Sequence, residues 1–346
     1  MKAMTRVGAM IFWALFFLLV TPALAAPPQG AKPIKITYAG LMPVGHMVTK
    51  SQQLFAELVE KESNGLIKVD LYPAGQLYTD KSIMDAFTSG AVEMGEIHPA
   101  MWAGKSPAML GYYMLGAFDT PKQQWRFVDG PYTQILNHEL VKLNTKILGW
   151  TDYGKTQGIL TRKPATSRKD LIGLKVRALG AIDSVFFEGL GMKPTTVSSA
   201  ETYMALMQGT VDAAFAGYSS MIERKWYEAA KYSFSAPKGS FLTYATFPVG
   251  VNLKWWNTLP GWAQDIISRK TLESVEWSRQ AANKSDDEAE EKIQKLGVSI
   301  HYMSNEEWRA WKGEPMEKEK AYLLKVTGEV IGKQILDAMK AAAAQK

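Results

Sequence analysis

The first hundred residues alternate between strand-like and helix-like spacings of apolar side chains. We expect strands in "IKITYAG" from Ile34, in "NGLIKVDLYPAG" and in "AVEMGEI". Helical spacing predicts helices over about residues 48–63 and in "DKSIMDAFTSG", between these strands. Strand, helix, strand, helix, strand with short turns is the pattern of a parallel sheet covered by helices.

A similar order of elements returns between residues 171 and 217. The runs "LIGLKVRAL", "KPTTVS" and "TVDAAFAG" predict strands, and "GAIDSVFFEGLG" and "SAETYMALMQG" predict helices. Residues 84–96 can be aligned with residues 203–215. Each segment predicts a helix, a glycine that ends it, and a strand that begins with valine and a carboxylate. The alignment favours two similar lobes over a chance match of a common unit.

The chain becomes predominantly helical after Val251. One long helix is predicted by "PGWAQDIISRKTLESVEWSRQAANKSDDEAEEKIQKLG", a short strand by "VSIHYMS", and further helix, interrupted at Pro315, by the remainder. A helix of this length can brace one lobe against the other. We expect a first lobe over 26–150 and a second over 151–250. The connecting helix and the C-terminal helices then occupy 251–346, and part of this region packs back onto the first lobe.

The N-terminus has the three parts of a signal peptide in order. Lys2 and Arg6 precede the apolar run "AMIFWALFFLLV", and "TPALA" supplies small residues for cleavage, predicted after Ala25. The apolar run ends at Pro22, short of the roughly 20 residues that span a membrane. Residues 1–25 are therefore expected to direct the chain to the periplasm and to be removed there.

Charge and composition narrow the possible functions. Removal of Lys2 and Arg6 lowers the formal net charge from +6 to +4, and no lysine block is present, so we expect no nucleic-acid partner. The 346 residues include no cysteine, which excludes a thiol nucleophile and a cysteine metal site. The sequence also lacks the GxSxG, HExxH and GxxxxGK[ST] motifs. We expect neither an enzyme nor a cofactor.

One charged residue interrupts an apolar strand. Arg177 lies in the middle of "DLIGLKVRALG", where a charged side chain costs folding energy unless something pairs with it. The pattern alone leaves three alternatives, which are an exposed edge position, a ligand anion, and an internal ion pair with Asp170, Asp183 or Glu188. A guanidinium presents a planar fork that matches the two oxygens of a carboxylate.

From about residue 34 to residue 339 the chain resembles the periplasmic solute-binding subunits of TRAP transporters, the DctP family. The resemblance is carried by "ITYAGLMPVGHMVTKSQQLFAELVEKESNGLIKVDLYPAGQL", "MDAFTSGAVEM", "SRKDLIGLKVRALG", "YMALMQGTVDAA" and "VGVNLKWWNTLPGWAQDII". It implies an α/β, two-lobed periplasmic binding protein fold with a long helix bridging both lobes. It also implies a monomer that captures a small-molecule organic acid and delivers it to TRAP permease membrane subunits. In that family, an arginine of the "GLK(I/V)R" strand forms a two-pronged salt bridge with the ligand carboxylate, and Arg177 occupies this position.

The chain departs from the family pattern at two places. Many relatives carry a second arginine about twenty residues earlier, where this chain has Gln157; nearby Lys155 can restore the charge, or both can be ordinary strand and turn residues. Dicarboxylate- and sialate-binding relatives place Glu and Asn where Phe215 and Ala216 stand. Phe215 and Tyr218 make this wall aromatic instead. The ligand is expected to be either a dicarboxylate or an aromatic or longer monocarboxylate.

The remaining candidates each have a structural alternative. Trp102, with Trp150 and Tyr153, can extend the aromatic wall or pack in the core. His46 and Asn252 can border the cleft, or serve as a loop histidine and a helix cap. His98 and Glu96 can share a strand face, but no third metal ligand is evident, so no metal site is predicted. A periplasmic sensor that presents an organic acid to a receptor is the alternative function.

Overall fold

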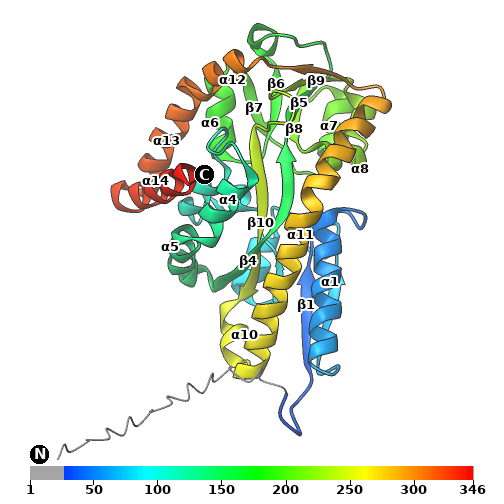
Figure 1. The fold of residues 1–346 in the computed structure, drawn as a ribbon, viewed down its shortest axis with the longest axis vertical. Coiled ribbons are helices and arrows are strands. Elements are labelled where there is room, and N and C mark those ends of the chain that lie inside the picture. Colours follow the sequence, from blue (N-terminus) through cyan, green and yellow to red (C-terminus); the bar gives the residue numbers. More distant parts are fainter. Residues whose placement is uncertain (1–26, 346) are drawn as a thin grey trace, which may run out of the picture.

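The computed structural model of the chain describes residues 27–345 (Figure 1). The predicted signal peptide and its cleavage site lie outside these residues. Within the described part of the chain, no helix is long and apolar enough to cross a membrane.

The predicted strands of the first third build one side of a five-stranded sheet. Its order is β2 (Ile67–Tyr72), β1 (Ile34–Ala39), β3 (Met94–Glu96), β10 (Thr243–Asn252) and β4 (Thr145–Thr156). β1 pairs in parallel with β2 and β3, as expected, whereas β10 runs antiparallel to β3 and β4. The predicted helices are α1 (Met47–Glu62) and α2 (Ile83–Ser89).

The second predicted group of strands supplies three strands of a six-stranded sheet. Its order is β11 (Ser299–Tyr302), β9 (Tyr232–Ser235), β5 (Gly158–Thr161), β8 (Ala213–Ala216), β6 (Lys175–Ala178) and β7 (Lys193–Thr196). The helices that follow its strands are α6 (Ala181–Gly189), α7 (Thr202–Gln208), α8 (Tyr218–Glu223) and α9 (Trp226–Ala229). The aligned glycines Gly90 and Gly209 end α2 and α7 with left-handed φ angles of 82° and 73°. This confirms the helix–glycine–strand unit in both halves.

Two long strands and one long helix join the sheets. β4 is separated from β5 of the second sheet by Gln157 alone, and β10 lies antiparallel beside β4 in the first sheet. The expected lobe boundaries at 150 and 250 fall inside these two strands. Helix α11 (Gly261–Lys295) has 35 residues, about 52 Å at 1.5 Å per residue, and lies against α1 and β4 as well as α8 (Figure 1). The predicted α/β fold with a bridging helix is confirmed.

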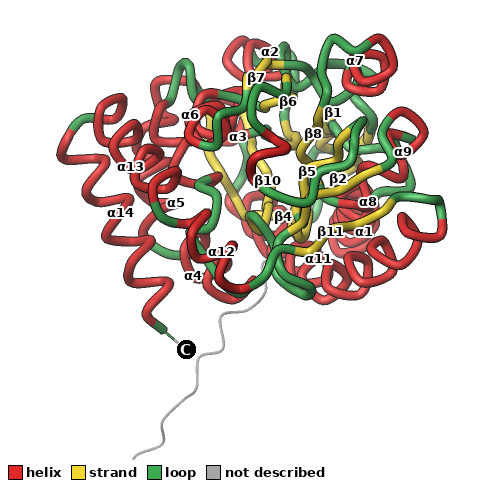
Figure 2. Tube along the Cα trace, turned by 90° about the horizontal axis from the view of Figure 1, so that it is seen from above, coloured by secondary structure: helices red, strands yellow, loops and turns green. Residues whose placement is uncertain are grey.

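The C-terminal helices form a layer on the other side of the molecule. Gly313 and Gly328 separate α12 (Asn305–Lys312), α13 (Glu314–Thr327) and α14 (Glu329–Ala344), while Pro315 lies in the first turn of α13, where proline is tolerated. These helices pack on α6 and on elements of residues 107–140 (Figure 2). The shorter elements are α3 (Pro99–Trp102), η1 (Pro107–Tyr113), α4 (Pro121–Asp129), α5 (Pro131–Leu140), η2 (Val141–Leu143), η3 (Arg168–Leu171) and α10 (Leu253–Thr258).

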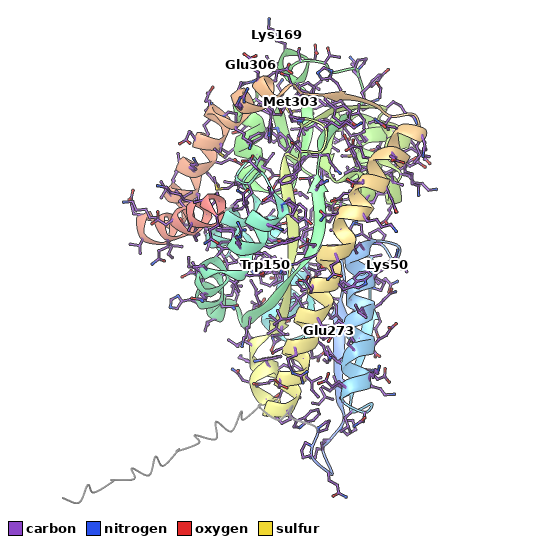
Figure 3. All side chains as sticks on the ribbon, in the orientation of Figure 1. Lys50, Trp150, Lys169, Glu273, Met303 and Glu306 are labelled. Carbon is purple, nitrogen blue, oxygen red and sulfur yellow. The ribbon has the colours of Figure 1, made fainter. Side chains whose placement is uncertain are left out.

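The interior between these layers is apolar. Lys50, Lys169 and Glu273 project from the surface, while Trp150 and Met303 are buried (Figure 3). The largest cluster of buried apolar side chains includes residues of both sheets and of the C-terminal helices. Burial of this cluster is the main favourable contribution to folding in a chain without disulfides.

Candidate ligand-binding site

A cavity of about 360 Å³ lies where the two sheets and the joining strands meet. A second cavity of about 460 Å³ adjoins it, and both are lined by Met42, His98, Ser199 and Arg224. Met42 follows the first strand of the first sheet, whereas Ser199 and Arg224 belong to loops of the second sheet. The two cavities are therefore compartments of one cleft.

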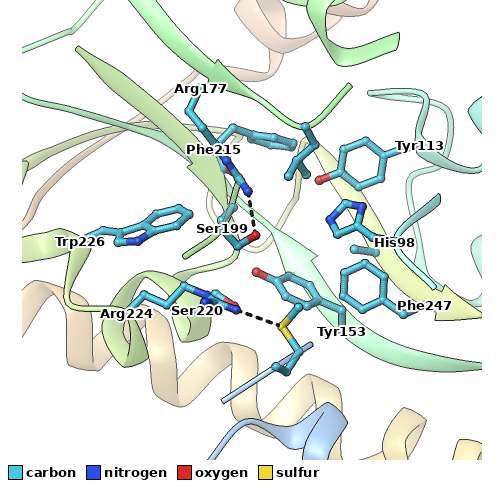
Figure 4. A pocket seen from close by; sticks show the side chains of 14 residues that line it. His98, Tyr113, Tyr153, Arg177, Ser199, Phe215, Ser220, Arg224, Trp226 and Phe247 are labelled. Atoms are coloured by element: carbon cyan, nitrogen blue, oxygen red, sulfur yellow. Dashed lines mark hydrogen bonds between the residues drawn. The ribbon is translucent and has the colours of Figure 1, made fainter. Parts of the chain in front are cut away.

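Arg177 is held in the first cavity by all three of its guanidinium nitrogens. It lies on β6 and is 2% exposed. Its Nε donates to the Val197 carbonyl at 3.1 Å, its Nη1 to the Phe215 carbonyl at 3.1 Å, and its Nη2 to Ser199 Oγ at 2.8 Å (Figure 4). The guanidinium carbon lies 5.3 Å from the centre of the Trp226 ring, which adds a cation–π contact. The side chain is thus fixed in one orientation before any ligand binds.

Arg177 has no carboxylate partner within 4.0 Å among residues 27–345. Asp183, one of the sequence alternatives, instead accepts the backbone N–H groups of Leu179 and Gly180 at the start of α6. Asp170 likewise accepts backbone N–H groups of its own turn. Burial lowers the pKa of Arg177 from its usual value, but an arginine starts high enough to stay charged. Asp80 and Asp183 lie near enough to favour the charged form of Arg177, but neither carboxylate is in direct contact with the buried guanidinium.

The unused donors of Arg177 match a carboxylate in number. A guanidinium has five N–H bonds, and the three observed hydrogen bonds use one on each nitrogen. One N–H therefore remains on Nη1 and one on Nη2. Two parallel N–H donors are what bidentate recognition of a carboxylate requires.

A second guanidinium, that of Arg224, reaches the same cleft. Arg224 follows the last residue of α8, and the next residue, Lys225, is left-handed with a φ of 57°. Because Lys225 turns the chain, both Arg224 and the buried Trp226 line the first cavity (Figure 4). Arg224 Nη2 makes only long contacts, 3.4 Å to the Leu41 carbonyl and 3.8 Å to Met42 Sδ. Sequence reasoning missed this residue, since the run "ERKW" does not reveal which side chains point inward.

Aromatic rings belong to half of the other residues that line the first cavity. The ring of Tyr113 meets that of Phe215 edge-on at 6.0 Å, and Tyr153 meets Phe247 edge-on at 5.3 Å. His98 lies 5.2 Å from Phe247, and burial lowers the pKa of His98 to about 4, so its ring is neutral at neutral pH. The first cavity is therefore lined by aromatic rings, other apolar residues and the hydroxyl groups of Ser199 and Ser220, and its charge is concentrated in the two arginines.

Three residues that the sequence offered for the site, Arg177, Phe215 and Tyr153, line the cavity, whereas His46 does not line it but contacts Tyr153. The His46 ring stacks on that of Tyr153 at 5.1 Å, and its Nδ1 accepts the N–H of Val48 at the start of α1. Burial lowers the pKa of His46 to about 3. The structure thus places a neutral His46 in contact with a wall residue.

Gln157, Lys155 and Tyr218 line neither cavity. Gln157 Oε1 accepts the N–H of Tyr218 at 3.2 Å, and the Tyr218 hydroxyl shares a hydrogen bond with Ser233. The Lys155 ammonium lies 3.3 Å from Asp287 of α11. In this structure Gln157 and Lys155 connect the link between β4 and β5 to α8 and α11.

Trp102 and Asn252 also lie away from both cavities. Trp102 is fully buried with its ring edge-on to Phe87 at 5.6 Å. Asn252 begins α10, where its side chain accepts the N–H of Trp255 at 2.9 Å and donates to the Phe87 carbonyl at 2.6 Å. These contacts account for both residues as packing and capping groups.

The described residues contain no group of three or more His, Asp or Glu side chains placed to hold a metal ion. Glu96, the possible partner of His98, accepts the Leu41 N–H at 3.1 Å and the Gln52 side-chain N–H at 3.0 Å. Burial raises the pKa of Glu96 to about 7. Glu96 is therefore engaged in the first sheet and its loops.

Comparison with known proteins gives one consistent family. The model of the bacterial extracellular solute-binding proteins, family 7 (DctP), matches residues 38–322. The C4-dicarboxylate-binding periplasmic protein DctP of Rhodobacter capsulatus is 29% identical over 343 residues, 96% of each chain. A TRAP periplasmic solute-binding protein of Desulfovibrio salexigens with bound orotic acid has a TM-score of 0.84 at 20% identity, covering 90% of this chain and 98% of that one. The sugar acid binding protein of Advenella mimigardefordensis in complex with galactonate has a TM-score of 0.82 at 24% identity, covering 90% and 99%.

Proposed function

The chain belongs to family 7 of the bacterial extracellular solute-binding proteins, and we propose that it binds an organic acid through a carboxylate–guanidinium pair at Arg177. Members of this family bind small organic acids outside the cytoplasm and work with TRAP permeases. The observation that carries the proposal is the buried, charged Arg177, which has two free N–H donors and no internal carboxylate in direct contact. Both carboxylate oxygens then pair with the terminal nitrogens of this side chain.

The rest of the ligand occupies the aromatic slot. Trp226 lies against the Arg177 guanidinium, and the rings of Tyr113, Phe215 and Phe247 supply apolar walls. Such walls gain most from a flat or extended body that covers the rings and leaves its acidic end at the guanidinium. The candidates are a dicarboxylate and an aromatic or longer monocarboxylate.

Contacts between the lobes support capture by closure. Lys81, before α2, lies 3.2 Å from Glu201 near α7, and the Ser199 N–H donates to Asp80 at 3.4 Å. Ser199 also accepts from Arg177, so a ligand at Arg177 lies beside the contact between the lobes. A ligand that touches both lobes favours the closed state by its difference in affinity for the two states. The closed surface is then presented to the permease.

The test is a thermal-shift screen of purified protein against organic acids, followed by calorimetry on Arg177→Gln. Loss of two charge-assisted hydrogen bonds of about 1.5–3 kcal/mol each predicts a fall in affinity of roughly 10²–10⁴-fold. Arg309→Gln is the matched control, because Arg309 is exposed on α12, and it should bind like the wild type. Equal affinity of Arg177→Gln and wild type for the best ligand would overturn the proposal.

A further inference from the structure

We infer that Arg224 is a second anion-binding residue, and that it makes this site selective for flat diacids over the corresponding monoacids. The inference rests on the proposed function, because it assumes that one carboxylate is held at Arg177. It adds the residue that receives the other end of the ligand and the charge that the ligand must carry.

The side chains that line the first cavity carry positive charge. Of the side chains that line the first cavity, Arg177 and Arg224 are cationic, and none is a carboxylate. His98 is neutral at neutral pH, because its pKa is lowered to about 4. Among residues 27–345, Asp80 is the one carboxylate that lines either cavity; it lines the second and accepts the Ser199 N–H, and with Asp183 it favours the charged form of Arg177. Neither guanidinium has a carboxylate in direct contact, so a dianion can pair with both cations of the first cavity and a monoanion with one.

Among residues 27–345, Arg224 has guanidinium N–H donors that no protein acceptor uses. Its only hydrogen bonds are the two long ones from Nη2 to Leu41 and Met42, and no carboxylate lies within 4.0 Å of it among residues 27–345. The neutral acceptors at 3.4 and 3.8 Å are poor partners for a charged donor, whose good hydrogen bonds are about 2.7–2.9 Å long. Arg224 is therefore held across the two lobes by weak contacts that an incoming anion can replace.

The positions of the two guanidinium groups suit a ligand with two acidic ends. They approach the cavity from two sides, with Ser199 between them (Figure 4). Trp226 lies on one flank of this pair, while His98, Tyr113 and Phe247 lie on the opposite flank (Figure 4). The inference places a planar body between these flanks, with one acidic group toward each arginine. A second acidic group at Arg224 would lie where the two lobes meet, because Arg224 follows α8 of the second lobe and Leu41 follows β1 of the first.

The experiment compares benzoate with the three benzene dicarboxylates, and butanoate with succinate, by calorimetry. We expect at least one benzene dicarboxylate to bind about 10-fold or more tightly than benzoate, and more tightly than succinate. In Arg224→Gln, the affinity for that diacid should fall roughly 10–100-fold toward the benzoate level, while benzoate affinity changes by less than about 3-fold. Arg224→Lys, which keeps the charge, should retain part of the preference, and Arg309→Gln should retain all of it.

Three outcomes would overturn the inference. They are an equal loss of benzoate and diacid affinity in Arg224→Gln, unchanged diacid affinity in that variant, and no benzene dicarboxylate binding better than benzoate. Arg177→Gln separates this failure from that of the proposed function. If Arg177→Gln abolishes binding of the acids while Arg224→Gln has no effect, only the role of Arg224 is wrong. If Arg177→Gln also has no effect, the carboxylate site itself is wrong.

Discussion

Replacing Arg177 by lysine keeps a cation in the cavity but removes the fork that we expect to hold the ligand. The guanidinium uses three donors on Val197, Phe215 and Ser199 and keeps two for a carboxylate. A lysine ammonium has three donors on a single atom, so it cannot keep these anchors and also span both carboxylate oxygens. At least one charge-assisted hydrogen bond to the ligand is lost. At about 1.5–3 kcal/mol, this loss lowers affinity roughly 10–150-fold.

The same substitution introduces a pH dependence. Burial lowers the pKa of Arg177, which stays charged because arginine starts above about 12. A lysine starts near 10.4, and full burial can lower its pKa by as much as 3–5 units, to between about 5 and 8. Arg177→Lys should therefore bind more tightly as the pH falls from 8 to 6 and the ammonium becomes protonated. The wild type should show a smaller change over the same range.

The assay is calorimetric titration of wild type, Arg177→Lys and Arg309→Lys with the best acid of the screen at pH 6, 7 and 8. Arg309→Lys corrects for the general effect of exchanging an exposed arginine. Circular dichroism melting of the ligand-free proteins checks that the variants are folded. Wild-type affinity for Arg177→Lys at pH 8 would refute the argument that the fork, rather than the charge alone, binds the ligand.

Two further predictions concern residues outside the cavity. Lys155→Ala should leave ligand affinity within about 2-fold of wild type. It should lower the free energy of unfolding by at most about 1 kcal/mol, because Lys155 pairs with the exposed Asp287. A 10-fold loss of affinity in calorimetry would contradict the position of Lys155 outside the cavity. Burial raises the pKa of Asp152 to about 7, so between about pH 4 and 7 the folded state holds a proton that the unfolded chain has released. The free energy of unfolding should fall as the pH rises through this window, by at most about 1.4 kcal/mol per pH unit from this group. Asp152→Asn keeps an acceptor for Tyr244 and Trp125 and should reduce that slope in urea titrations, whereas parallel curves would contradict the assignment.

The fold follows from local patterns that a single sequence contains. Helix α2 and helix α7 are each ended by a glycine in a left-handed conformation, and the strands after them begin at Met94 and Ala213, two residues beyond the predicted valines. Pro315 marks the boundary between two C-terminal helices because proline fits only the first turn of the second one. Patterns of this kind depend on neighbouring residues, and tertiary contacts do not reverse them here.

The candidate site was only partly accessible to the same reasoning. Arg177 stands out because it is a charged residue flanked by Val176 and Ala178 in the middle of an apolar run. Arg224 lines the cavity because Lys225 adopts a left-handed conformation, which is uncommon for a residue other than glycine and gives no sequence signal. Phe247 belongs to β10, all ten residues of which are buried, so alternation does not indicate which of its side chains face the cleft. Gln157 forms the single-residue link between β4 and β5, which only the pairing of those strands reveals.

The most direct test of the account is a crystal structure of the protein with the tightest ligand from the screen. We predict that both oxygens of one ligand carboxylate lie about 2.7–2.9 Å from Nη1 and Nη2 of Arg177, with the ligand body between Trp226 and the rings opposite it. A ligand carboxylate bound elsewhere in the cleft, with the terminal nitrogens of Arg177 facing water or protein carbonyls, would contradict the central claim.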